Sequence, residues 1–155
     1  AKFSNAGRSF MDDPKCELVQ AWLLKAQTDL ISARRLAAGD NPLWDTAVFH
    51  CQQAAEKAVK GYLVFNDRRF RKTHDVEDLV KVAEAYDDRF STWHDAAKLV
   101  TPYAQAFRYP AEEPEPDQEK YVAAEQAAAG LFAFVCSLLP EEARPPTPPG
   151  PGPTA

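Results

Sequence analysis

Residues 50–63 read HCQQAAEKAVKGYL, and this stretch decides the fold class of the chain. Within and around it, apolar side chains recur at intervals of three and four residues, which is the spacing of one face of an α-helix. That face consists of Trp44, Val48, Cys51, Ala55, Val59, Tyr62 and Leu63. We therefore predict a helix over residues 43–65, which begins after Asn41-Pro42 and ends at Asn66-Asp67.

The same periodicity continues on both sides of this helix and predicts four more, over residues 14–38, 73–89, 91–107 and 117–139. Pro102 is expected to kink or shorten the helix that contains it. The apolar face of the first helix is expected to hold Leu18, Trp22, Ala26, Leu30, Ala33 and Leu36. Short connections between long amphipathic helices favour antiparallel neighbours. The sequence thus predicts an all-α, up-and-down bundle of four to five helices over residues 14–139.

The two ends of the chain differ from this helical region. Residues 1–13 are expected to form a flexible arm, in which Met11 is one candidate for the natural start. Residues 140–155 are rich in proline and glycine, a composition that predicts a disordered tail. The run Pro145–Pro149 could adopt polyproline II and bind a partner, although a loose tail is the simpler interpretation.

Composition limits the class of protein. With 155 residues and a net charge of -5, the chain fits one domain, and its acidity argues against a general nucleic-acid coating protein while leaving room for a local basic site. Three widely spaced cysteines, Cys16, Cys51 and Cys136, predict buried free thiols in a reducing cytoplasm. The first ten residues lack the apolar core of a signal peptide, and no apolar run is judged long enough to span a membrane, so we expect a cytoplasmic protein without membrane contact.

Metal and cofactor sites are not indicated. The three histidines, His50, His74 and His94, are far apart and show no ligand spacing with carboxylates. The chain also lacks a glycine-rich phosphate loop and a GxSxG motif. We therefore expect neither a bound metal nor a cofactor.

A basic segment is the first candidate site. Arg68, Arg69, Arg71, Lys72 and His74 crowd together just before the third predicted helix, whose free backbone amides would add positive charge. Guanidinium groups suit bidentate contact with phosphate. Because acidic residues follow at once and a charged run is usually solvated surface, a plain surface loop explains the segment equally well.

Two further candidates are weaker. His50, Gln53, Lys57 and Lys60 share one polar side of the second helix, which is normally the solvent side of a bundle helix. At the end of the fourth helix, Arg108 could contact a phosphate and Tyr109 could stack on a base, while favourable interaction with the helix dipole also explains the arginine.

Four blocks of this sequence together resemble the HEPN domain family. Residues 50–63 are similar to the second-helix signature of that family, and Lys72-Thr73-His74-Asp75 is similar to its next block. Arg108-Tyr109-Pro110 resembles its later motif, and residues 22–36 fit its first helix. The four blocks occur in the family order and cover residues 17–139.

The resemblance implies a helical bundle that forms a homodimer and acts with a minimal nucleotidyltransferase, often as a toxin–antitoxin pair. Many members of the family are metal-independent ribonucleases, in which an arginine and a histidine, separated by four to six other residues, face their copies across the dimer. In this sequence no histidine follows Arg108 at that spacing. Arg69 with His74 and Arg89 with His94 do have the spacing, and these four residues are the candidates for catalysis.

Three functions follow as hypotheses. The first is a module that binds a nucleotide or nucleic acid beside a nucleotidyltransferase, with the ligand contacting Lys57, Lys60, Arg69, Lys72, His74, Arg108 and Tyr109. The second is a metal-independent ribonuclease toxin that uses His74 or His94. The third is a dimeric interaction protein without a ligand.

Overall fold

The computed structural model describes residues 14–107, 109–110 and 114–148. In this part the chain forms five α-helices and three short 3-10 helices, and no strand is present among these residues. The α-helices are α1 (Pro14–Ala37), α2 (Trp44–Phe65), α3 (Val76–Glu84), α4 (His94–Val100) and α5 (Gln118–Leu138). The 3-10 helices are η2 (Asp88–Trp93), η3 (Thr101–Ala104) and η4 (Glu141–Ala143). The predicted all-α bundle is confirmed.

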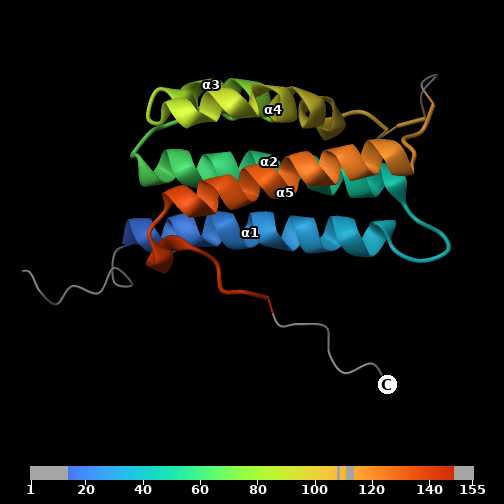
Figure 1. The fold of residues 1–155 in the computed structure, drawn as a ribbon, viewed down its shortest axis with the longest axis horizontal. Coiled ribbons are helices and arrows are strands. Elements are labelled where there is room, and N and C mark those ends of the chain that lie inside the picture. The colour runs from blue at the N-terminus through green and yellow to red at the C-terminus, as the bar shows by residue number, and fades with distance from the viewer. Residues whose placement is uncertain (1–13, 108, 111–113, 149–155) are drawn as a thin grey trace, which may run out of the picture.

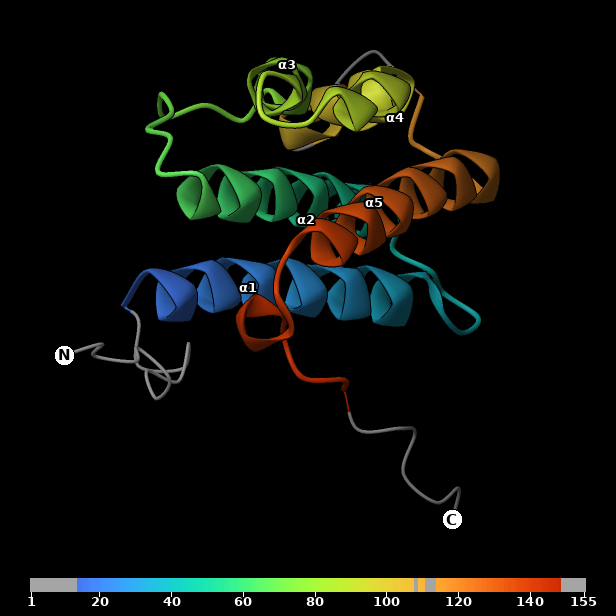
Figure 2. The same ribbon diagram turned by 60° about the vertical axis from the view of Figure 1, so that its left-hand side comes forward.

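Helix α2 lies at the centre of the bundle. Figures 1 and 2 show α1 along one side of it, α3 and α4 on the opposite side, and α5 crossing against it. Small side chains let α1 and α2 approach closely: a Cβ atom at Gly61 would lie only 2.3 Å from Cδ2 of Leu23. This central position is why most of the residue 50–63 stretch is buried, polar side chains included.

The region after α3 is more broken than its sequence pattern predicts. Instead of two long helices over residues 73–89 and 91–107, the chain forms α3, η2, α4 and η3 in succession. Helix α3 ends at Glu84, and Asp87 caps η2 by accepting a hydrogen bond from the backbone amide of Arg89. Pro102 lies in the first turn of η3, so α4 ends at Val100, in agreement with the expected shortening.

The predicted inward face of α1 is confirmed for Ala26, Leu30 and Ala33, which are buried, but not for Leu18. Its buried residues include Cys16, Val19, Leu23, Ala26, Leu30 and Ala33. Leu18 was predicted to face the core but is 51% exposed. The prediction was wrong because two overlapping apolar stripes run along this helix, and the sequence pattern alone does not show which one meets α2.

The predicted boundary of the bundle at residue 139 lies too early for the described residues. Ala143 in η4 is fully buried, and Gln20 and Gln27 of α1 donate hydrogen bonds to the backbone oxygens of Arg144 and Pro146. Residues 140–146 therefore pack along α1. The two glutamine side chains donate hydrogen bonds to backbone carbonyl groups, for which a proline-rich segment has few backbone N–H donors of its own. The predicted arm, residues 1–13, and the end of the tail, residues 149–155, lie outside the described residues.

Helix α5 is long and apolar enough to cross a membrane by length and composition alone, contrary to the expectation that no apolar run reaches this length. In the bundle, however, Ala124, Ala128, Leu131 and Val135 of this helix belong to the buried core. Its apolar character therefore serves packing at least along this face.

Candidate functional site

A buried carboxylate on α2 is the centre of a polar cluster. Glu56 is 4% exposed, and its oxygens accept hydrogen bonds from Nζ of Lys60 at 2.7 Å and from Nε2 of Gln52 at 2.9 Å. Nδ1 of His74, from the segment before α3, lies 3.1 Å and 3.3 Å from the two oxygens. The spacing of four residues between Gln52, Glu56 and Lys60 aligns the three side chains on one face of the helix.

These contacts determine the charge of the cluster. Burial raises the pKa of Glu56, but the hydrogen bonds from Lys60 and Gln52, the positive charge of Lys60 and the contact with His74 outweigh it, so the pKa lies below its ordinary value. Glu56 is therefore a carboxylate at neutral pH. It provides a fixed negative charge beneath the segment that joins α2 to α3.

The cluster also fixes the path of that segment, residues 66–75. Gln52 donates a second hydrogen bond, to the backbone oxygen of His74, at 2.9 Å. The ammonium group of Lys60 lies 5.5 Å from the ring centroid of Phe70 and 5.9 Å from that of Trp22, and these two rings meet edge to face. The segment is thus attached to the bundle at Phe70 and at His74.

Between and beside these attachments, the cations of the predicted basic segment point outward. Arg68, Arg69, Arg71 and Lys72 are exposed, and within the described part of the chain none of them forms an ion pair. The neighbouring acids have other partners: Asp75 caps α3 by accepting from the amide of Asp78, and Glu77 pairs with Lys81. We call residues 68–72 the basic loop, and no ion pair within the described residues neutralises its charge.

His74 is held at one ring nitrogen and open at the other. Its side chain is 61% exposed, and among the described residues no group bonds its Nε2. It lies in a hollow of about 490 Å³ that Lys72–Asp75 form with residues of η3 and Gln105. A carboxylate on Nδ1 favours the tautomer that leaves Nε2 free to accept a proton from a ligand.

The polar stripe predicted on α2 places several of its side chains against buried carboxylates inside the bundle. Lys60 is buried in the Glu56 cluster. Lys57 donates to the buried carboxylate of Asp29 at 2.5 Å, and His50 contacts the same carboxylate through Nδ1 at 2.8 Å. Both lysines therefore have internal partners, which explains their position better than direct contact with a ligand does.

In neither of the two candidate pairs does the structure bring the arginine and the histidine to the same site. Arg69 lines a hollow with α1, whereas His74 lines the separate hollow beside η3. Arg89 pairs with Asp87, and His94 pairs with Glu84, so these two residues bond different carboxylates. Arg108 lies outside the described residues, and Tyr109 is 76% exposed.

Glu56, Gln52 and Asp29 are site residues that the sequence pattern did not single out. Their signal was present, since a glutamate and a glutamine occur within the most apolar part of α2, but a charged residue at such a position is ordinarily counted as surface. The remaining chemistry is limited: within the described residues no group of three or more acidic, histidine or cysteine side chains could hold a metal ion. Burial raises the pKa of Cys51 to about 12, so this thiol is not a nucleophile at neutral pH.

Comparison with known proteins places these features in a family context. The family model described as the HEPN domain matches residues 19–138. The crystal structure of ST0689, an archaeal HEPN homologue, is 25% identical with a TM-score of 0.63, covering 77% of this chain and 96% of its own. The crystal structure of TT1696 from Thermus thermophilus is 28% identical with a TM-score of 0.66, covering 78% of this chain and 98% of its own. No curated protein matches the chain.

Proposed function

Because the chain belongs to the HEPN domain family, we propose that it is a nucleotide- or nucleic-acid-binding module whose phosphate site is the basic loop. The observation that carries this proposal is a group of four exposed cations, none of which forms an ion pair with any described residue, on a segment that the Glu56 cluster holds in place. In an acidic protein such a group stands out as a local anion site. A fixed loop also loses less conformational entropy on binding than a free one would.

The family supplies the wider setting of the proposal. We propose that the chain forms a homodimer in the cytoplasm and acts with a minimal nucleotidyltransferase, as one half of a toxin–antitoxin pair. Co-purification of the two proteins from a strain that expresses both, followed by measurement of the mass of the complex, tests the partnership directly.

Removing two cations of the basic loop should weaken nucleic-acid binding. For the double variant Arg69→Ala/Lys72→Ala, we expect the dissociation constant for a fluorescent single-stranded RNA to rise about tenfold, and the slope of log K against log salt to decrease in magnitude by about 1.4. Fluorescence anisotropy at several salt concentrations measures both quantities. The matched control is Arg35→Ala, which removes an exposed arginine at the other end of α1.

Two results would contradict the proposal. One is equal binding by the parent and the double variant, and the other is an equal loss in the Arg35→Ala control, which would indicate attraction by overall charge rather than by the loop.

A second candidate function is metal-independent RNA cleavage, and the geometry of His74 favours it. With Nδ1 held by Glu56, the free Nε2 could accept the proton of a 2′-hydroxyl as its oxygen attacks phosphorus. The 5′-oxygen would leave and take a proton from water, which gives a 2′,3′-cyclic phosphate and a 5′-hydroxyl end. The separation of Arg69 from the His74 hollow means that a second arginine, from the same or another chain, would have to stabilise the phosphorane.

An RNA cleavage assay in excess EDTA tests this second function. If it holds, the parent protein cleaves RNA and His74→Ala loses at least about a hundredfold in rate, the usual contribution of a general base. His94→Ala is the matched control, because its ring is paired with Glu84 elsewhere in the bundle. Cleavage that persists in His74→Ala would rule out His74 as the base, and a parent without cleavage would leave binding as the function.

A further inference from the structure

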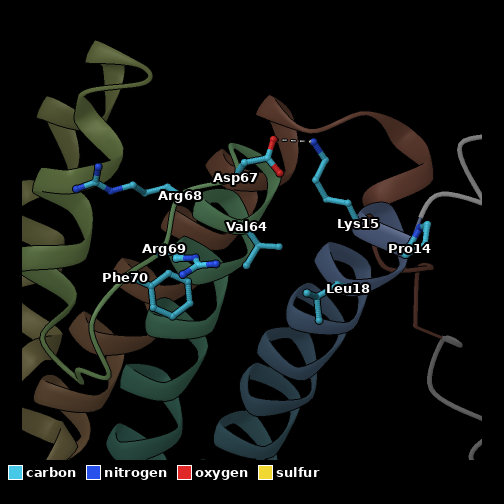
Figure 3. Close-up of a pocket in the computed structure, with 8 residues that line it drawn as sticks. All are labelled: Pro14, Lys15, Leu18, Val64, Asp67, Arg68, Arg69 and Phe70. Atoms are coloured by element: carbon cyan, nitrogen blue, oxygen red, sulfur yellow. Dashed lines mark hydrogen bonds and ion pairs between the residues drawn. The ribbon is translucent and has the colours of Figure 1, made fainter.

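An apolar hollow, separate from the one that His74 lines, adjoins the basic loop. Leu18 of α1, Val64 at the end of α2 and Phe70 of the loop line it, and Figure 3 shows Leu18 and Val64 facing each other from their two helices. Its volume is about 640 Å³, and it is shallow and wide open to solvent. None of the candidate sites in the sequence included Leu18 or Val64.

The charged residues at the rim of this hollow differ in whether they form ion pairs. Asp67 is paired with Lys15 across the gap between α2 and α1, as Figure 3 shows. Arg69 lies beside Phe70 and has no ion pair within the described residues, whereas the side chain of Arg68 extends away from the apolar wall. The hollow therefore combines an apolar wall, which includes the half-exposed Leu18, with an adjacent guanidinium that has no ion pair among the described residues.

We propose that this hollow receives the base of a nucleotide whose phosphate is bound by Arg69, so that the ligand of the basic loop is a nucleoside phosphate rather than a bare phosphate. This inference rests on the proposed function and specifies its ligand. A nucleobase is flat and largely apolar on its faces, and such faces stack on aromatic rings and guanidinium planes. Leu18, which is 51% exposed, and Phe70 supply apolar contact for such a ring, and the unpaired Arg69 supplies the complementary charge.

Leu18 is the residue that tests the proposal most directly. Because it is half-exposed, shortening it removes a wall of the hollow without opening the core, whereas Phe70 also holds the loop in place through Lys60. Leu24 is a matched control: it is also on α1, is 44% exposed and does not line the hollow.

The experiment compares adenosine 5′-monophosphate with ribose 5-phosphate, which carries the same phosphate and sugar without the base. Dissociation constants are measured by NMR titration for the parent, Leu18→Ala and Leu24→Ala. In the parent and in Leu24→Ala we expect the nucleotide to bind about tenfold more tightly than the sugar phosphate, the usual effect of stacking one base. In Leu18→Ala the advantage should fall severalfold while ribose 5-phosphate binds as before, and Leu18→Trp, which fills the hollow, should abolish the advantage.

The outcomes separate the two proposals. Equal affinity of the parent for both compounds, with binding that depends on Arg69, would overturn the base site and leave the phosphate site standing. An advantage that Leu18→Ala and Leu18→Trp do not alter would place the base elsewhere and also overturn the inference. Failure of the parent to bind either compound would contradict the base site, and failure to bind RNA as well would contradict the proposed function.

Discussion

Replacing Glu56 by glutamine is expected to lower the free energy of unfolding by about 3–5 kcal/mol, the usual cost of breaking a buried ion pair on one side. The change leaves the ammonium group of Lys60 buried between Trp22 and Phe70 without its negative partner. It also weakens the contact that holds His74, so the basic loop should lose part of its order. Urea denaturation followed by circular dichroism measures the stability, and amide hydrogen exchange of residues 66–75 measures the loop.

Two comparisons make this prediction specific. The double variant Glu56→Leu/Lys60→Met removes both charges and should recover most of the lost stability, since apolar residues of similar size often replace a buried pair without cost. Glu77→Gln breaks an ion pair of the same helical spacing on the surface and should cost less than about 1 kcal/mol. A Glu56→Gln variant as stable as Glu77→Gln would show that the Glu56 cluster does not stabilise the bundle.

Replacing Phe90 by alanine is the second large effect, with an expected loss of about 3–5 kcal/mol. Phe90 is fully buried in η2, with its ring centroid 4.8 Å from that of Tyr62 and 4.9 Å from that of Phe134. Removing the ring leaves a cavity between α2 and α5. It also removes the contacts that hold η2 against these two helices. Thermal and urea denaturation both report this loss.

The neighbouring Tyr86 provides the control for Phe90. It is 42% exposed, so Tyr86→Ala should change stability by no more than about 0.5 kcal/mol. Phe90→Leu, which keeps much of the volume, should fall between the two. Similar losses for Phe90→Ala and Tyr86→Ala would contradict the assignment of Phe90 to the core.

The sequence was sufficient for the helices that carry a long and regular apolar face. Helices α1, α2 and α5 begin and end within a few residues of their predicted bounds, because each has a clear start signal and a periodic core face. The region of residues 85–107 was predicted less well, since the anchor there is one aromatic ring, Phe90, whose partners come from helices distant in the sequence. Such tertiary contacts override the local preference for a continuous helix.

For the candidate site, too, the sequence indicated some residues and missed the surroundings of others. Arg69, Lys72 and His74 were chosen as candidates because a cluster of basic residues is visible in a linear sequence, and their role in binding stays a prediction. Lys60 was expected to contact a ligand, but it is buried and paired with Glu56 inside the bundle. Burial is decided by what packs over a helix, here the loop that carries Phe70 and His74, and the sequence of α2 does not contain that information.

The way the basic loop is attached has a consequence for protein engineering. Its fixed conformation comes from Gln52, Glu56 and Lys60 beneath it, whereas the exposed cations at residues 68, 69, 71 and 72 make no ion pair in the part of the chain that the structure describes. Recognition and scaffolding are therefore carried by different side chains. The loop can serve as a variable surface in a combinatorial library, in which these four positions are randomised to select new anionic targets while the supporting residues of α2 are kept unchanged.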